Sequence, residues 1–203
     1  MTTIDTAGRP ASGYDGVAVA LHWAIFLMIA GLFASGEIAG GIGDQIKQLQ
    51  GLGTDPDGVK ALMAQRGQLM GMHKAGGVIV FALVVARLFW RATRGAPAPV
   101  QTSPMIDLAA KSAHGLLYVL LIVMPVSGFM MSMYAGRGVE MLGIPPLLTP
   151  VPELAKQFNA VHGFTMNLIL LIVFLHAAAA LWHHYVRRDE TLGRMVPWLR
   201  GRA

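Results

Sequence analysis

Residues 162–185 read HGFTMNLILLIVFLHAAAALWHHY, an apolar run that begins with His162 and carries a second histidine, His176, fourteen positions later. A helix rises about 1.5 Å and turns about 100° per residue, so the two imidazoles share one face about 21 Å apart. A hydrocarbon core is roughly 30 Å thick, which puts one imidazole near each leaflet. Ionisable residues at membrane depth are costly and mark function, and histidine is a common axial ligand of haem iron. The run therefore predicts a membrane helix that carries two stacked haems.

The composition of the chain indicates a membrane protein. Of its 203 residues, 54% are hydrophobic and 13% are charged, whereas soluble domains carry about 25% charged residues. The absence of cysteine excludes disulfides, thiolate metal sites and covalent haem attachment through C-x-x-C-H, so any haem is held non-covalently. The net charge of +5 does not indicate a nucleic-acid partner, because the location of the charges matters more than their sum.

Four apolar stretches approach the length of about 20 residues that a membrane span needs. They cover residues 17–36, 69–90, 114–134 and 163–185. Backbone groups in lipid must be hydrogen-bonded within the chain, so each stretch is expected to be a helix. The predicted fold class is an all-α integral membrane protein, a single domain in which a four-helix transmembrane bundle encloses two haems b.

The sequence also predicts the structure of the segments that connect the spans. Residues 37–68 are predicted to form a long periplasmic connection, with a short interfacial helix over 57–69 capped by Asp57. Residues 153–161 are expected to lead directly into the last span, and Pro125 is expected to kink the third. Residues 186–203 are predicted to form a cytoplasmic tail.

The charges of the connections predict the orientation. Basic residues outnumber acidic ones in the second connection and in the C-terminal tail, where they are Arg91, Arg94, Lys111, Arg187, Arg188, Arg194, Arg200 and Arg202. The first and third connections are close to balanced in charge. By the positive-inside rule, both termini and the second connection are cytoplasmic.

With this orientation, four of the seven histidines form two pairs matched in depth. His22 and His176 lie in the cytoplasmic half of the bundle, and His73 and His162 lie at the periplasmic ends of their helices. A single histidine near a helix end is equally well explained as an interfacial residue whose ring reaches the headgroups. Two matched pairs favour bis-histidine ligation of two haems.

Small residues flank these histidines. Gly76 and Gly77 follow His73 on its own face, and Gly163 follows His162. A flat macrocycle between helices needs such space near its ligands. Ordinary packing of small residues between membrane helices explains each of them about as well.

Five more polar residues are candidate contacts of haem or substrate. Arg87 shares the face of His73 at the depth of the cytoplasmic pair, where it would pair with haem propionates or lie among lipid headgroups. His114 is a candidate quinone donor or propionate partner, although an interfacial position explains it more simply, and His183 is a candidate for a quinone site or a proton path. His184 is expected to be interfacial. Lys74 either places positive charge near the periplasmic haem or is an interfacial lysine.

Several segments resemble the bacterial cytochrome b561 family, the four-helix, di-haem b-type cytochromes of the inner membrane. They are LHW at His22, MHKAGG at His73, AHGLLYVLLIVMPVSG over 113–128, and H-x13-HAAAALWHHY followed by RRDETLGRM. The resemblance covers nearly the whole chain and implies that His22 with His176 and His73 with His162 are the axial pairs. It also implies electron transfer between the ubiquinone pool and a second redox partner, which in one branch is superoxide at the periplasmic face.

The first connection is longer than in compact members, and the balanced periplasmic charge does not favour steering of an anion such as superoxide. The expected function is that of an electron-transfer oxidoreductase between a periplasmic redox partner, with superoxide a candidate, and ubiquinone. One alternative is a membrane-anchor cytochrome b subunit that relays electrons for a dehydrogenase or hydrogenase. Another is a non-redox transporter or proton pathway with histidine relays, which would be colourless.

We expect two haems b per chain, extracted by acidified organic solvent because no cysteine tethers them. Pyridine haemochrome assay of fully loaded, detergent-purified protein measures the stoichiometry. A value of one or zero would contradict the two-pair arrangement.

Overall fold

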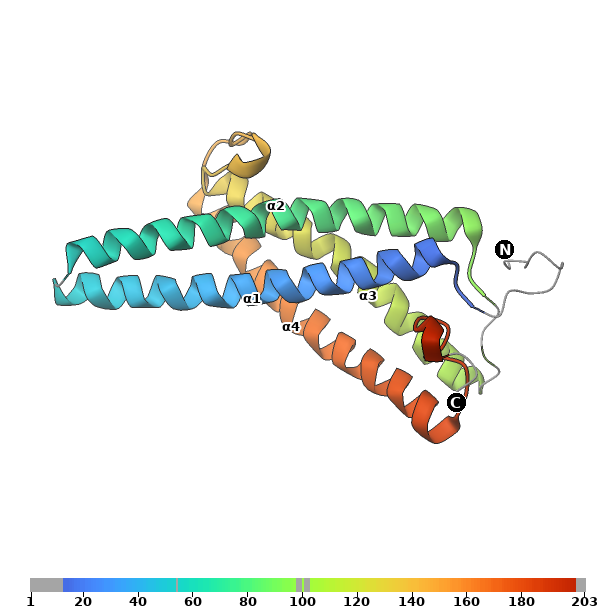
Figure 1. The fold of residues 1–203 in the computed structure, drawn as a ribbon. Helices are drawn as coiled ribbons and strands as arrows, with labels where there is room; N and C mark the ends of the chain where they lie inside the picture. The colour runs from blue at the N-terminus through green and yellow to red at the C-terminus, as the bar shows by residue number, and fades with distance from the viewer. Residues whose placement is uncertain (1–12, 54, 98–99, 101–102, 200–203) are drawn as a thin grey trace. The chain divides into compact units, whose positions relative to one another are not determined.

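The computed structural model describes residues 13–53, 55–97, 100 and 103–199. Four long helices dominate this part of the chain: α1 (Gly16–Leu52), α2 (Pro56–Arg94), α3 (Pro104–Tyr134) and α4 (Pro152–Trp182) (Figure 1). Each is long and apolar enough to cross a membrane, and none of the described residues lies in a β-strand. The predicted all-α, four-span class is confirmed. The charges of Arg200 and Arg202 lie outside the described residues.

Large apolar side chains face outward on all four helices. Leu27 is 65% exposed, Phe89 68%, Leu116 46% and Phe174 70%. Apolar surface on this scale is unfavourable in water and marks contact with another apolar phase. The backbone of each helix satisfies its own hydrogen bonds, so such a helix can face lipid directly. The outward side chains therefore fit a bilayer.

The helices are longer than the apolar stretches, and the first connection is mostly helical. α1 ends at Leu52 and α2 begins at Pro56, with positive φ at Gly53 (66°) and Asp55 (52°) in the turn between them. The Asp55 side chain accepts a hydrogen bond from the Gly58 backbone N–H at 3.0 Å, as an N-cap does. The prediction of a separate helix over 57–69 capped by Asp57 is wrong, because those residues continue into the second span without a break.

The two extended helices pair through an apolar seam. Ile42 and Ile46 of α1 pack with Val59 of α2, and partly buried leucines surround them, namely Leu49, Leu62 and Leu69. The Arg66 Nε–H donates to the Ala39 carbonyl at 3.0 Å. A seam of this kind stabilises long helices through tertiary packing, because propensity alone stabilises little.

The third and fourth helices begin with capping residues. The Ser103 hydroxyl accepts from the Ile106 N–H at 3.4 Å at the start of α3, and α3 continues through Pro125 to Tyr134. α4 starts with proline at Pro152, which a first helical turn tolerates because it needs no N–H there. The expectation that residues 153–161 lead into the last span is confirmed.

Two short turns and an apolar cluster occupy the connection between α3 and α4. The 3₁₀ turn η1 (Glu140–Leu142) follows Val139, which forms a cluster with Met133 and Ala75. The Ser132 hydroxyl donates to the carbonyls of Arg137 and Gly138 at 3.1 and 3.2 Å. These contacts hold the connection against the middle of α2 and the end of α3.

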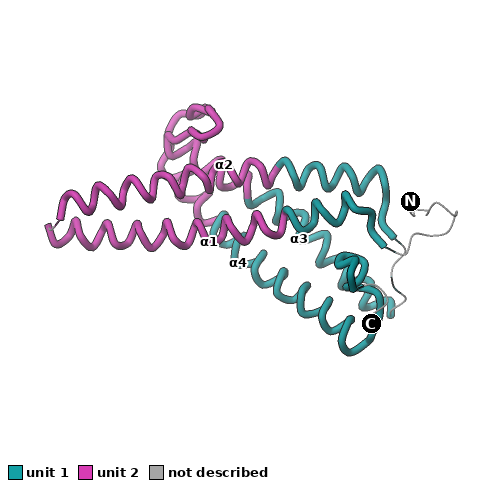
Figure 2. Tube along the Cα trace, in the orientation of Figure 1, with its two compact units in different colours: residues 1–24, 82–124, 162–203 teal, residues 25–81, 125–161 magenta. Residues whose placement is uncertain are grey.

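The chain divides into two compact units (Figure 2). Unit 1 comprises residues 1–24, 82–124 and 162–203, and unit 2 comprises residues 25–81 and 125–161. Unit 2 contains one histidine, His73, and unit 1 contains the other six, His22, His114, His162, His176, His183 and His184. Each long helix contributes to both units, so each unit is built from all four.

The predicted C-terminal tail packs back onto the helices of unit 1. A π-helical turn, η2 (His183–Arg187), follows α4, and the 3₁₀ turn η3 (Pro197–Leu199) ends the described chain. The Trp23 indole N–H donates to the Met195 carbonyl at 2.8 Å, and Val196 is buried. This segment is therefore anchored to α1 as far as residue 199.

Gly76 allows α1 and α2 to approach closely in unit 2. It is buried, and a Cβ atom there would lie 2.7 Å from Leu32 Cδ2. Of the two explanations that the sequence leaves open for Gly76, this contact favours helix packing. Gly77 and Gly163 have nothing within 4 Å of an added Cβ.

We expect Gly76→Val to destabilise the protein by about 1–3 kcal/mol, because the added atoms must displace Leu32 in a packed interface. Thermal unfolding in detergent measures the loss. The matched control is Gly67→Val in the same helix, where nothing lies within 4 Å of the added Cβ. Equal midpoints for the two variants would mean that α1 and α2 do not need the close approach.

Candidate functional site

Unit 1 brings together polar side chains from all four helices. The ring centroids of His22 on α1 and His176 on α4 lie 6.3 Å apart, with an angle of 64° between the rings. The ring of His114 on α3 packs edge-on against His176, with centroids 5.2 Å apart. The sequence left His114 without a partner at its depth, and the structure supplies one. His114 is nevertheless exposed, whereas His22 and His176 are half-buried.

Arg87 on α2 completes this cluster. Its Nη1 donates to the Ala18 carbonyl at 2.7 Å, one turn of α1 before His22. The guanidinium charge is close enough to act on the rings of His22, His114 and His176. A fixed guanidinium beside these rings is a ready partner for a carboxylate that enters the cluster.

His73 lies in unit 2, on the face of α2 that meets α1. Its Nδ1 lies 3.0 Å from the Leu32 carbonyl oxygen and 3.1 Å from the Ser35 hydroxyl. The Ser35 hydroxyl itself donates to the Leu32 carbonyl at 2.9 Å. Gly36 lies next to the His73 ring, because a Cβ atom added at Gly36 would lie 3.5 Å from His73 Cε1.

His162 lies in unit 1, in the third turn of α4. Its Nδ1 lies 2.9 Å from the Met124 carbonyl oxygen on α3. His73 and His162 thus make the same contact, from Nδ1 to a main-chain carbonyl of a neighbouring helix. A carbonyl only accepts hydrogen bonds, so Nδ1 carries the proton in both rings. Nε2 of the neutral ring then has the lone pair that a metal ion needs.

The histidine geometry fits haem. The centroids of His22 and His176 are separated by 6.3 Å, with 64° between the rings. Imidazole nitrogen–metal bonds are about 2.0–2.1 Å, so these two side chains are close enough that both could hold one haem. Among the described residues, no group of three or more His, Cys, Asp or Glu side chains is arranged to hold a metal ion. Two histidines suffice for haem, because the macrocycle supplies the remaining ligands.

His183 forms a hydrogen-bonded pair just beyond α4. Its Nδ1 lies 2.5 Å from Asp189 Oδ2, and Asp189 Oδ1 accepts from the Thr191 N–H at 2.9 Å. Burial by itself would raise the pKa of the Asp189 carboxyl, but hydrogen bonds from Thr191 and His183 bring that pKa below its ordinary value. Asp189 is therefore an ionised partner that orients the His183 ring.

His184 and Lys74 differ from their expected roles. His184 is only 8% exposed, and its Nδ1 is buried without a hydrogen-bond partner among the described residues, so the expectation of an interfacial ring at the headgroups is wrong. Lys74 donates to the Gly138 carbonyl at 2.7 Å and forms an ion pair with Glu140. The hydrogen bond from Lys74 lowers the pKa of the Glu140 carboxyl. Lys74 is thus neutralised in place.

Ser35 and Asp189 are site residues that sequence reasoning did not single out. Ser35 lies in an apolar stretch with no motif around it, and its role depends on α1 meeting α2 at His73. Asp189 lies in the RRDETLGRM segment, where an acidic residue among arginines was a usable signal. In the described structure the Asp189 carboxylate pairs with His183 rather than with an arginine.

Comparison with known proteins identifies similar chains. A family model for prokaryotic cytochrome b561 matches residues 13–198. Cytochrome b561 homolog 1 of Escherichia coli (strain K12) is 28% identical over 187 residues, which are 91% of this chain and 97% of that protein. Probable superoxide oxidase CybB of Yersinia pestis is 27% identical over 194 residues, 93% and 98% of the two chains. Cytochrome b562 of Cereibacter sphaeroides is 28% identical over 184 residues, 91% and 95%.

Proposed function

Since the chain belongs to the prokaryotic cytochrome b561 family, a family of haem b proteins of membrane electron transport, we propose that it holds two haems b through two pairs of histidines. Electrons then pass across the membrane between a periplasmic redox partner and ubiquinone. The observation that carries this proposal is the arrangement of four imidazoles between helices. The rings of His22 and His176 lie close together, and His73 and His162 each donate from Nδ1 to a main-chain carbonyl of a neighbouring helix.

The first pair is His22 with His176. It is supported by the 6.3 Å separation of the ring centroids, which is close enough that both could hold one haem. Arg87 is the proposed partner of the propionates of that haem, because its charge lies beside both rings. His114 borders the same group through its contact with His176.

The second pair is His73 with His162. Its support is the identical hydrogen bonding of the two rings, together with their matched depth in the sequence. Hydrogen bonds from Nδ1 hold each ring in position and raise the basicity of Nε2. At His73, the Ser35 hydroxyl is a second acceptor for Nδ1. Bound haem supplies the one-electron chemistry that these side chains lack.

Ubiquinone is proposed to react beside the first pair, near His114 and His183. Reduction of a quinone to a quinol takes two electrons and two protons, so a group that exchanges protons must lie at its carbonyls. The Asp189 carboxylate holds Nδ1 of His183, which leaves Nε2 to give or take a proton. His114 offers an exposed ring next to His176.

Superoxide is a candidate donor at the opposite end, and the support for it is one relative whose name is probable superoxide oxidase. Electrostatic steering does not add support, because the Lys74 charge is paired with Glu140. The α1–α2 hairpin beyond the predicted spans offers a surface for a protein partner instead, as the membrane-anchor alternative requires. Dependence of haem reduction on a co-purified subunit would favour that alternative.

We expect His22→Ala and His176→Ala to remove one haem component, and His73→Ala and His162→Ala to remove the other. Each substitution deletes one of the two axial ligands of an iron. Haem content and low-temperature reduced spectra measure the losses. His184→Ala is the control and keeps both components. If His22→Ala and His73→Ala removed the same component, the proposed pairing would be wrong.

We expect His114→Leu and His183→Leu each to weaken ubiquinone-1 affinity about threefold to tenfold, the value of one hydrogen bond. Asp189→Asn should act in the same direction as His183→Leu, because it weakens the bond that orients the ring. Stopped-flow re-oxidation of reduced haem measures the affinity, with both haem spectra intact. Tyr185→Leu, which removes an exposed polar group of the same turn, is the control. Unchanged kinetics in the His114→Leu/His183→Leu double variant would place the quinone elsewhere, most plausibly near Lys74.

A further inference from the structure

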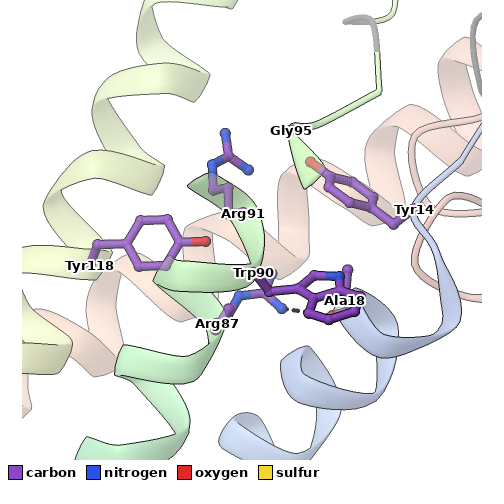
Figure 3. A pocket seen from close by; sticks show the side chains of 7 residues that line it. All are labelled: Tyr14, Ala18, Arg87, Trp90, Arg91, Gly95 and Tyr118. Atoms are coloured by element: carbon purple, nitrogen blue, oxygen red, sulfur yellow. Dashed lines mark hydrogen bonds between the residues drawn. The ribbon is translucent and has the colours of Figure 1, made fainter. Parts of the chain in front are cut away.

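A small open cavity lies in unit 1, where α1 begins and α2 ends (Figure 3). Its lining includes two arginines, two tyrosines and a tryptophan, namely Arg87, Arg91, Tyr14, Tyr118 and Trp90. Its enclosed volume is only about 10 Å³, which is about the space of one water molecule, so a larger polar group would bind at its open mouth rather than inside it.

The lining is positively charged and includes hydrogen-bond donors that could bind a ligand. No acidic residue is among the lining residues. Arg87 uses Nη1 for the Ala18 carbonyl, which holds its guanidinium in place and leaves its other N–H groups. The Arg91 guanidinium makes no hydrogen bond or ion pair to any residue that the structure describes, and the Tyr118 hydroxyl points toward α2 (Figure 3).

Asp15, the nearest acidic residue, is occupied elsewhere. Its carboxylate accepts from the Trp90 indole N–H at 3.0 and 3.1 Å and from the Ala18 N–H at 2.9 Å. Arg94 lies over the Trp90 ring, 5.1 Å from its centroid, and its charge also acts on Asp15. Asp15 is therefore occupied by Trp90, Ala18 and Arg94, and among the described residues Arg91 has no counter-ion.

The combination of residues indicates the ligand. Guanidinium groups bind the oxygens of phosphate and carboxylate groups with charge-assisted hydrogen bonds. Tyrosine and tryptophan collect at the level of lipid headgroups, and basic groups at the inner surface attract anionic lipids. We infer that the mouth of this cavity binds the phosphate of an anionic phospholipid headgroup through Arg91, with Tyr118 as a further donor.

This inference does not depend on the haem ligands, and its test does not use electron transfer. Native mass spectrometry counts phosphatidylglycerol molecules retained by the full-length protein, with phosphatidylcholine as the zwitterionic comparison. We expect Arg91→Gln to weaken retention of phosphatidylglycerol about tenfold or more, since it removes a charge-assisted bond. Tyr118→Phe should weaken it about threefold, the value of one neutral hydrogen bond. Arg91→Lys keeps the charge and should retain part of the binding.

The matched control is Lys111→Gln, which removes one positive charge on the same predicted side of the membrane from an exposed position outside the cavity. It should retain phosphatidylglycerol as the unchanged protein does. Millimolar inorganic phosphate should displace the lipid only weakly, because it lacks the acyl chains. Full displacement by inorganic phosphate would overturn the lipid assignment in favour of a free anion. If Lys111→Gln and Arg91→Gln lost equal amounts of phosphatidylglycerol, general surface charge would explain the binding, and the proposed site would be wrong.

A third result is also informative. If Arg91→Gln left lipid retention unchanged but lowered haem content, the cavity would serve a carboxylate of the cofactor, and the lipid proposal would be wrong. Because haem content is read from the absorption spectrum of the same samples, failure of the lipid site is distinguishable from failure of the haem proposal.

Discussion

In hydrocarbon, every main-chain N–H and C=O group must find its partner within the protein, and an α-helix is the simplest segment that meets this demand. The described chain follows this constraint closely: α1 alone runs from Gly16 to Leu52, and three residues separate it from α2. The long helices leave their large apolar side chains facing outward. Polar side chains within the spans are consequently few, and each one needs a partner on a neighbouring helix.

Those partners are mostly helix carbonyls that already accept a main-chain hydrogen bond. A carbonyl oxygen has two lone pairs, so it can take a second donor without loss of helix. Leu32 receives His73, Met124 receives His162 and Ala18 receives Arg87. Each contact ties one helix to another and orients a functional side chain at the same time. The polar contacts that link the helices are thus also the ones that prepare the imidazoles for a metal.

Charged side chains outside the histidine cluster have local partners. Lys74 is paired with Glu140, and the Asp189 carboxylate is hydrogen-bonded to His183. The beginning of α1 and the end of α2 depart from this pattern, because Asp15 bonds to Trp90 and Arg91 is left facing a cavity. An unpaired guanidinium is tolerable at a surface that anionic lipids cover.

The sequence by itself determined the fold class and the family. Apolar length predicts the spans, and periodicity places His162 and His176 on one face, because a membrane helix has a fixed rise and turn. Helix boundaries were less predictable: residues 37–52 and 56–68 are polar enough to read as a connection, and they are helical because Ile42, Ile46 and Val59 pack across the hairpin. Such a seam depends on which helix lies opposite, and a single stretch of sequence does not contain that information.

The contacts of the site were likewise decided only by the tertiary structure. Depth along a helix can be counted from the sequence, and it matched His22 with His176. The rotation of each helix toward its neighbours cannot be counted in this way. It sets the hydrogen bond of Ser35 with His73, the packing of His114 on His176 and the burial of His184. These contacts join residues far apart in the chain, and they exist only because the packed helices bring those faces together.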